Sequence, residues 1–183
     1  GAQDGAIHLF PLSVTDRGLV QALPHEIEQK LGAVDGVINC AGIIQPFANL
    51  IDLDYDDIDR VFDVNFRGTL YVTKAFLPSL LARPEAHIVN ISSMGGFLPV
   101  PGQTAYGASK AAVKLLTEGL SWMMRKADRA ARDILDGMEK NRLRVVVGRD
   151  AQLLDVLYRL DPVRATAFVA KQMRALLPSA TGR

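Results

Sequence analysis

Apolar residues recur along the chain with two different periods. Short, nearly continuous apolar runs at Ala6–Phe10, Val34–Asn39 and His87–Ser92 predict buried strands. Longer stretches with a 3.6-residue period, bounded by capping residues or by Gly and Pro, predict helices. These predicted helices are Thr15–Leu31, which Pro24 splits or kinks, Tyr55–Leu81 after the caps at 52–54, and Gln103–Met124.

The alternation of these elements predicts an α/β fold. Strands that alternate with helices form a doubly wound parallel sheet with helices on both faces. In such sheets, ligands bind beyond the carboxyl ends of the strands. We therefore expect the chemistry just after Asn39, just after Ser92, and at the helix starts that face them.

The C-terminal third continues the same domain. Its pattern predicts helices and one short strand, at Asp128–Lys140, Arg144–Val147 (the strand), Asp150–Tyr158 and Pro162–Leu177. No linker or repeat divides the chain, so we expect one domain over 1–183. Within it, 1–124 is the expected catalytic core and 125–183 a helical extension.

Composition narrows the class of protein. The 183 residues carry 21 basic and 20 acidic side chains, and this balance does not indicate a nucleic-acid partner. The lone Cys40 excludes an internal disulfide and a cysteine zinc cluster, and no apolar run is long enough for a transmembrane helix. With no signal-peptide pattern at the start, we expect a cytoplasmic protein. Residues 123–183 are net basic, which fits a solvated face, a membrane or an acidic partner.

Tyr106 and Lys110 form the first chemical candidate. They are four residues apart in a predicted helix, so both side chains lie on one face. An ammonium beside a phenol favours the phenolate, which makes a tyrosine useful as an acid or base. A surface pair with no function has the same spacing, so the pair alone does not decide.

Three further features favour a functional role for the Tyr106–Lys110 pair over a surface pair without function. Ser93 ends a predicted strand, where its hydroxyl could hold a substrate oxygen, although serines also simply terminate strands. Asn65 interrupts an apolar helical face and could hold a helix irregularity and a water beside Lys110; a locally satisfied Asn is the alternative. The small residues in 39–42 let the backbone approach a flat or sugar-like ligand, or form an ordinary strand exit.

Together these residues resemble the short-chain dehydrogenase/reductase family, single-domain branch. The family's Asn-Asn-Ala-Gly motif is similar to 39–42, with Cys40 in place of its second Asn. Its catalytic Asn and Ser match Asn65 and Ser93, and its Tyr-x-x-x-Lys matches Tyr106 and Lys110. The resemblance covers about residues 6–124 and implies a Rossmann-like fold.

The resemblance implies hydride transfer between NAD or NADP and a secondary alcohol or ketone. By analogy, Tyr106 is the acid/base, Ser93 positions the substrate oxygen, Lys110 assists Tyr106 and holds the nicotinamide ribose, and Asn65 keeps a relay water. The cofactor would contact Tyr106 and Lys110 together with four residues at the strand ends: Val14, Asn39, Ala41 and Gly42. Family members commonly form homodimers or homotetramers through the two long helices.

The sequence departs from the family pattern in two places. It has no glycine-rich phosphate-binding turn, and it opens near the family's third strand, so the residue that separates NAD from NADP cannot be read. The usual Asp-Val near the adenine is Ser13-Val14 here. After Met124 the family's next strand and substrate loop are missing, so we expect a longer parent protein.

Other functions fit the residues less well. A serine hydrolase would need a Gly-x-Ser-x-Gly turn and a placed histidine, and the chain offers neither. A truncated, non-catalytic homologue that serves as an interaction module is the main alternative, and dinucleotide binding separates it from an enzyme. The apolar loop Met94–Gln103 predicts a moderately hydrophobic substrate, or packs on the sheet edge instead.

Overall fold

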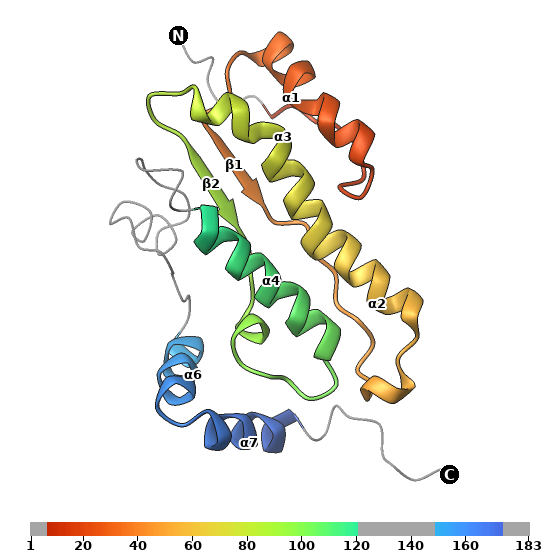
Figure 1. Ribbon diagram of the computed structural model, residues 1–183, viewed down its shortest axis with the longest axis vertical. Helices are drawn as coiled ribbons and strands as arrows, with labels where there is room; N and C mark the ends of the chain where they lie inside the picture. The colour runs from red at the N-terminus through yellow and green to blue at the C-terminus, as the bar shows by residue number, and fades with distance from the viewer. Residues whose placement is uncertain (1–6, 121–148, 174–183) are drawn as a thin grey trace.

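The computed structural model describes residues 7–120 and 149–173, which form an α/β fold (Figure 1). In chain order its helices and strands are α1 (Arg17–Leu31), β1 (Gly36–Asn39), α2 (Tyr55–Phe62), α3 (Thr69–Leu81), β2 (His87–Asn90), α4 (Thr104–Leu120), α6 (Arg149–Leu160) and α7 (Pro162–Met173). The predicted helix Asp128–Lys140 and strand Arg144–Val147 lie outside the described residues.

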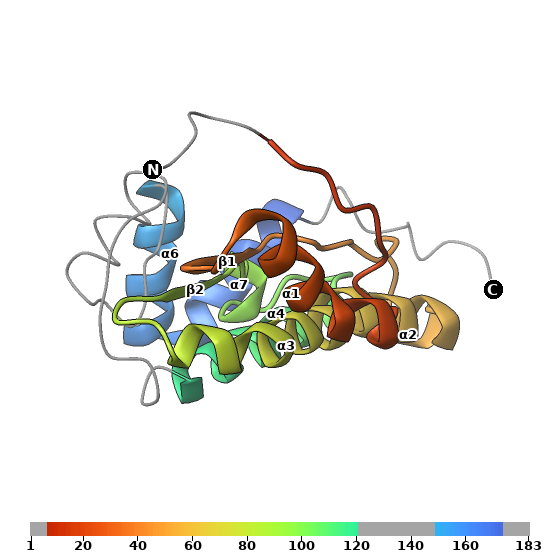
Figure 2. The same ribbon diagram turned by 90° about the horizontal axis from the view of Figure 1, so that it is seen from above.

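The predicted α/β class and parallel strand pairing are confirmed. β1 and β2 run parallel, with Gly36 opposite His87 and Asn39 opposite Asn90. α3 packs on both strands and α4 on β2, and Figure 2 shows these helices on the same side of the sheet. Right-handed crossovers that progress in one direction place their helices on one face.

The described helices cover only this one face of the sheet. Val37 packs into the core beneath the strands, whereas Ile38, the next residue, is 57% exposed. Side chains alternate across a strand, so Ile38 points to the face that no described helix covers. In a doubly wound sheet, helices cover the second face as well. Those helices follow the strands that lie on the opposite side of the first strand.

The predicted first strand is not formed. Residues 7–10 have no strand conformation, and Ile7 and Leu9 are 89% and 85% exposed. A strand is stabilised by hydrogen bonds to a neighbour, and β1 and β2 pair only with each other among the described residues. The prediction of a buried strand here is wrong, because residues 7–10 pair with no described strand and Ile7 and Leu9 stay exposed.

α1 is one continuous helix although Pro24 lies inside it. Asp16 caps its start as predicted, because its carboxylate accepts a hydrogen bond from Leu19 N at 3.0 Å. The buried Pro24 costs one backbone hydrogen bond. Leu23 and Ile27, on either side of it, pack against the core cluster and hold the helix together.

The predicted long helix Tyr55–Leu81 consists of α2, a π-helical turn at Asp63–Gly68, and α3. Asp54 occupies the N-cap position but makes no capping hydrogen bond with its side chain. The π turn fits one extra residue into the helix and keeps a single stripe facing inward. The buried residues of that stripe are Val61, Asn65, Thr69, Thr73, Phe76 and Leu80.

Two apolar clusters stabilise opposite ends of the molecule. The first joins α1, α3 and the strands around Phe76, Leu80 and Ala86. The second joins α6 and α7 to the loop after β2, where the fully buried Leu98 contacts Ala165 and Val169. In the two described ranges, no helix is both long and apolar enough to cross a membrane.

Candidate active site

The first two turns of α4 carry Tyr106 and Lys110, as the sequence predicts. Lys110 is 5% exposed, and its Nζ donates a hydrogen bond to Ile91 O at the end of β2 (2.9 Å). Burial lowers the pKa of Lys110, and the neighbouring Cys40 partly opposes this by raising it. Tyr106 is half-buried, four residues earlier on the same helix.

The turn that follows Ser93 packs directly on α4 because two glycines allow it. A Cβ on Gly96 would lie 2.9 Å from the backbone of Lys110, and a Cβ on Gly107 would lie 2.9 Å from Gly95 O. Ser92 Oγ reinforces the contact by donating to Lys110 O at 2.7 Å. This close packing fixes the strand end that carries Ser93 against the helix that carries Tyr106.

Ser93 and Tyr106 therefore border the same small space. A Cβ on Gly95 would lie 3.5 Å from Cε1 of Tyr106 and 3.8 Å from Oγ of Ser93. The Ser93 hydroxyl accepts a hydrogen bond from Gly95 N at 3.2 Å, which fixes its oxygen while its proton remains free to be donated. The two hydroxyl-bearing side chains that the sequence predicts to act together are thus brought together.

Asn65 lies in the π-helical turn and is completely buried. Its Oδ1 accepts from Ile43 N (2.8 Å), and its Nδ2 donates to Ile43 O (2.9 Å) and to Ser109 Oγ (3.0 Å). The predicted helix irregularity at this Asn is confirmed. The wider turn carries Asn65 far enough from the helix axis to clamp the loop after β1 onto α4.

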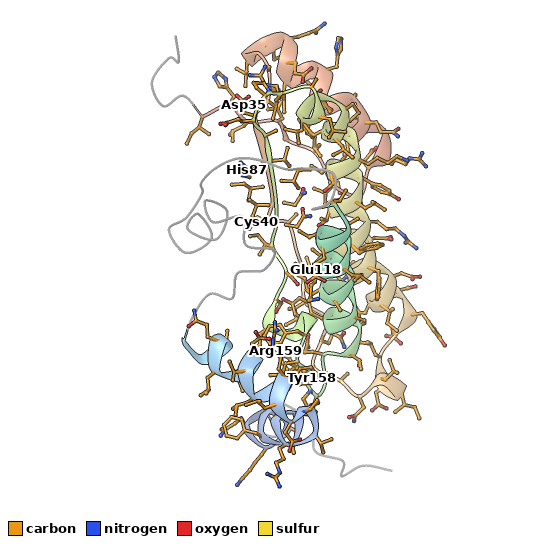
Figure 3. The ribbon with its side chains drawn as sticks, turned by 60° about the vertical axis from the view of Figure 1, so that its left-hand side comes forward. Asp35, Cys40, His87, Glu118, Tyr158 and Arg159 are labelled. Atoms are coloured by element: carbon orange, nitrogen blue, oxygen red, sulfur yellow. The ribbon has the colours of Figure 1, made fainter. Side chains whose placement is uncertain are left out.

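The loop after β1 brings Asn65 and Lys110 together at Gly42. A Cβ on Gly42 would lie 3.1 Å from Lys110 Nζ and 3.4 Å from Asn65 Oδ1. Glycine leaves room for the ammonium without a shift, whereas a side chain here would require the Lys110 ammonium to move by a few tenths of an ångström. Cys40 and Ala41 are exposed beside it. Figure 3 shows Cys40 at the carboxyl end of the strands, well away from Asp35 and His87 at their starts.

Two of the predicted cofactor residues have structural roles in this arrangement. Asn39 points inward, and its Nδ2 donates to Thr73 Oγ1 (3.1 Å) and to Asn90 Oδ1 (2.8 Å). Val14 packs on the π-helical turn, where a Cβ on Gly68 would lie only 2.7 Å from its Cγ2. Ala41 and Gly42 are the members of the predicted set that remain open at the strand ends.

The sequence reading missed two buried polar residues beside the site. Ser109 Oγ donates to Tyr106 O (2.7 Å) and accepts from Asn65, so it links the two candidates. Gln45, which is 2% exposed, accepts a hydrogen bond from Tyr106 N. A glutamine within the apolar run 43–47 was the available signal, since a polar residue in such a run needs a buried partner.

The loop after Ser93 packs differently from the sheet-edge alternative. Leu98 is turned into the cluster with α7, and Met94, Phe97 and Val100 pack around it while remaining partly exposed. α6 and α7 therefore pack against this loop (Figure 1). These partly exposed side chains follow Ser93 in the chain.

The arrangement gathers two hydroxyl groups, a buried ammonium and a buried carboxamide beyond the carboxyl ends of the two parallel strands. Residues 1–128 match the family model described as short chain dehydrogenase. The chain belongs to the short-chain dehydrogenase family. The matched range contains Asn65, Ser93, Tyr106 and Lys110.

Curated relatives of this chain carry oxidoreductase names. It is 33% identical over 195 aligned residues to the oxidoreductase SadH of Mycobacterium tuberculosis, covering 81% of this chain and 70% of the relative. It is 37% identical over 137 residues to an oxidoreductase of Staphylococcus aureus, covering 75% of this chain and 58% of the relative. The SadH alignment is longer than the part of this chain that it covers, so SadH has internal residues that this chain lacks.

Solved structures of proteins bound to nicotinamide cofactors are also similar to this chain. An NAD+-bound xylitol dehydrogenase matches with a TM-score of 0.60 and 32% identity, over 62% of this chain and 44% of that one. ElxO with NADP bound matches with the same TM-score and identity, over 62% of this chain and 46% of that one. The chain thus spans less than half the length of these Rossmann-fold dehydrogenases.

The residues present fit one end of a nicotinamide cofactor. Gly42 and Ala41 form an open surface at the strand ends, and the missing side chain of Gly42 leaves space at the Lys110 ammonium. These groups would hold the nicotinamide and its ribose. The glycine-rich turn that would bind the phosphates is not in the sequence, so the fit is limited to the reactive end.

Proposed function

We propose that this chain carries the catalytic residues of an NAD(P)-dependent oxidoreductase that interconverts a secondary alcohol and a ketone. One observation supports this most directly. Tyr106 and Lys110 lie on the α4 segment against which the turn after Ser93 packs, so a phenol, a hydroxyl and an ammonium are carried on adjoining segments beyond the strand ends. These are the groups that move a proton to or from a substrate oxygen.

Each residue has a distinct task in the proposed reaction. Carbonyl reduction adds a hydride at carbon and a proton at oxygen, and a bound nicotinamide cofactor supplies the hydride. Tyr106 gives the proton to the oxygen, and the Ser93 hydroxyl holds that oxygen by donating a hydrogen bond. Lys110 places its ammonium beside Gly42, where it would hold the nicotinamide ribose. Asn65 holds the loop after β1 in contact with α4.

The substrate in this proposal is moderately hydrophobic. Met94, Phe97 and Val100 are partly exposed in the loop that follows Ser93 in the chain, and their packing on Leu98 holds them in place. An apolar wall of this kind favours a ketone or alcohol with an alkyl or ring substituent. A panel of alcohols in which only small, highly polar ones react would contradict the wall.

A Tyr106→Phe variant tests the function. It removes the proton-transferring hydroxyl and keeps the ring that packs beside Gly95, so we expect turnover to fall roughly 10²- to 10⁴-fold without loss of fold. The measurement is the rate of NADH or NADPH formation with secondary alcohols, alongside circular dichroism. Near-normal turnover in this variant would falsify the assignment.

Dinucleotide binding separates the enzyme from the interaction module. Titrating NADH and NADPH into the chain, followed by nicotinamide fluorescence or by calorimetry, should show binding that Tyr106→Phe retains. A matched control is Tyr55→Phe, since Tyr55 is exposed at the start of α2. Failure of the chain to bind either dinucleotide favours the non-catalytic alternative.

A further inference from the structure

α4 begins without a capping residue of its own. Its first residue is Thr104, so Gln103 occupies the preceding position, where Ser, Thr, Asp or Asn usually caps the helix. The Gln103 side chain does not fold back on the helix but donates from Nε2 to Gln45 O at 3.1 Å. The amide of Tyr106, third in the helix, would then have no partner within α4.

Gln45 supplies the missing cap from a distant part of the chain. Its Oε1 accepts a hydrogen bond from Tyr106 N at 2.8 Å, across a sequence separation of 61 residues. Its Nε2 donates to Gly102 O at 3.3 Å, and Ala48 N donates to the same carbonyl at 3.3 Å. The carboxamide of Gln45 therefore uses both its acceptor and its donor on the start of α4.

The same loop is also held at its other end. Ile43, two residues before Gln45, is bound through both its N–H and its C=O by Asn65. Gly42 lies against the Lys110 ammonium. The segment 42–45 thus connects the groups around Lys110 to the backbone of Tyr106, and Gln45 makes the last link.

We propose that Gln45 is a positioning residue for Tyr106. It sets the place of the Tyr106 backbone relative to the loop at which the cofactor would bind, and so aims the phenol at the substrate oxygen. This role rests on the proposed function, because it presumes that Tyr106 transfers the proton. A displacement of about 1 Å in such a group costs roughly 10²-fold in rate, so the link matters for turnover more than for binding.

Amide hydrogen exchange tests the link without any assay of activity. The chain has four tyrosines, so labelling with ¹⁵N-tyrosine gives a spectrum in which Tyr106 is identified by its absence from Tyr106→Phe. We expect slow exchange at Tyr106 N–H in the unaltered chain, although it lies in the first helical turn. Fast exchange there would overturn the proposal before any variant of Gln45 is made.

Three variants connect the link to turnover. Gln45→Met keeps the volume but removes the acceptor, and should speed exchange at Tyr106 N–H and lower kcat roughly 10- to 100-fold with KM unchanged. Gln45→Glu keeps an acceptor and should retain slow exchange and a kcat above that of Gln45→Met. Gln103→Met removes a buried amide that bonds the same loop but not Tyr106, and should change kcat by less than about twofold.

The results for these variants distinguish a positioning role of Gln45 from a general structural role. Equal losses of kcat in Gln45→Met and Gln103→Met would show a general structural role and overturn the proposal, as would a Gln45→Glu variant no better than Gln45→Met. Slow exchange at Tyr106 N–H in Gln45→Met would also overturn it. Normal turnover in Tyr106→Phe would instead refute the proposed function, and the exchange data would still report on the link.

Discussion

Lys110 is a cation placed where water hardly reaches it. Its Nζ bonds to Ile91 O, and the space beside it exists because Gly42 has no side chain. Burial disfavours the charged form, which is why the pKa of Lys110 is lowered. The pKa of a lysine whose charged form is disfavoured by burial depends more on its surroundings than the pKa of a surface lysine does.

The stability of the fold should therefore depend on pH through Lys110. A lowered pKa means that the folded chain releases this proton before the unfolded chain does, so stability rises with pH between the folded value and the unfolded value near 10.5. Urea unfolding from pH 7 to 10.5 should show the unaltered chain gaining stability relative to Lys110→Met. Lys74→Met, at an exposed position on α3, controls for loss of a lysine charge. Parallel curves for the unaltered chain and Lys110→Met would contradict this expectation.

Sequence reasoning found the residues whose chemistry is visible in their spacing. Tyr106 and Lys110 stand out by their separation of four, and Asn65 by its place on an apolar face. Gln45 and Ser109 were missed because the partners that give them their roles, Tyr106 N for Gln45 and Asn65 for Ser109, are distant in the chain. Their roles arise from contacts across 61 and 44 residues, which only the folded chain defines.

At the scale of helices and strands, tertiary packing determines which elements form where local propensity allows more than one outcome. α1 continues through Pro24 because its neighbours reach the core, and residues 7–10 form no strand because no described strand pairs with them. The apolar period predicted the end of α3 at Leu81 and the positions of β1 and β2, although both strands are shorter than predicted. The length of the π-helical turn was not, since it depends on where Asn65 finds its partners.

Two glycines in α4 give a matched test of close packing. Gly107→Ala places a Cβ 2.9 Å from Gly95 O, so the turn that carries Ser93 must move, and we expect a loss of about 1–3 kcal/mol in the free energy of unfolding. Gly119→Ala meets nothing within 4 Å and should stabilise the helix by up to about 1 kcal/mol. Urea denaturation measures both. Equal effects of the two substitutions would be inconsistent with the contact at Gly95.

The part of the chain that the structure describes is organised around two separate apolar clusters. One joins the strands to α1 and α3, and the other joins α6 and α7 to the loop at Leu98. The predicted C-terminal helices were correct for the described range. What the sequence pattern did not reveal is that they pack on the loop after Ser93, because an apolar stripe shows that a helix is buried but not against what.

Leu98→Ala should loosen one end of the molecule selectively. Truncating this fully buried side chain costs about 2–5 kcal/mol in its cluster, so amides of α6 and α7 should exchange faster than those of the strands. Leu80→Ala, in the other cluster, should produce the reverse pattern. Hydrogen exchange with mass spectrometry measures both, and identical patterns in the two variants would show a single cooperative unit instead.

The cap that Gln45 places on Tyr106 also bears on the order of folding. Closing a loop of 61 residues has an entropic cost that grows with the logarithm of its length, and it comes before the contact is gained. The later turns of α4 can form from local hydrogen bonds, whereas its first turn must wait for β1 and the loop beyond it. The turn that carries Tyr106 is therefore among the last parts of the helix to become protected during refolding, and the proposed catalytic residue reaches its place only when the rest of the fold is nearly complete.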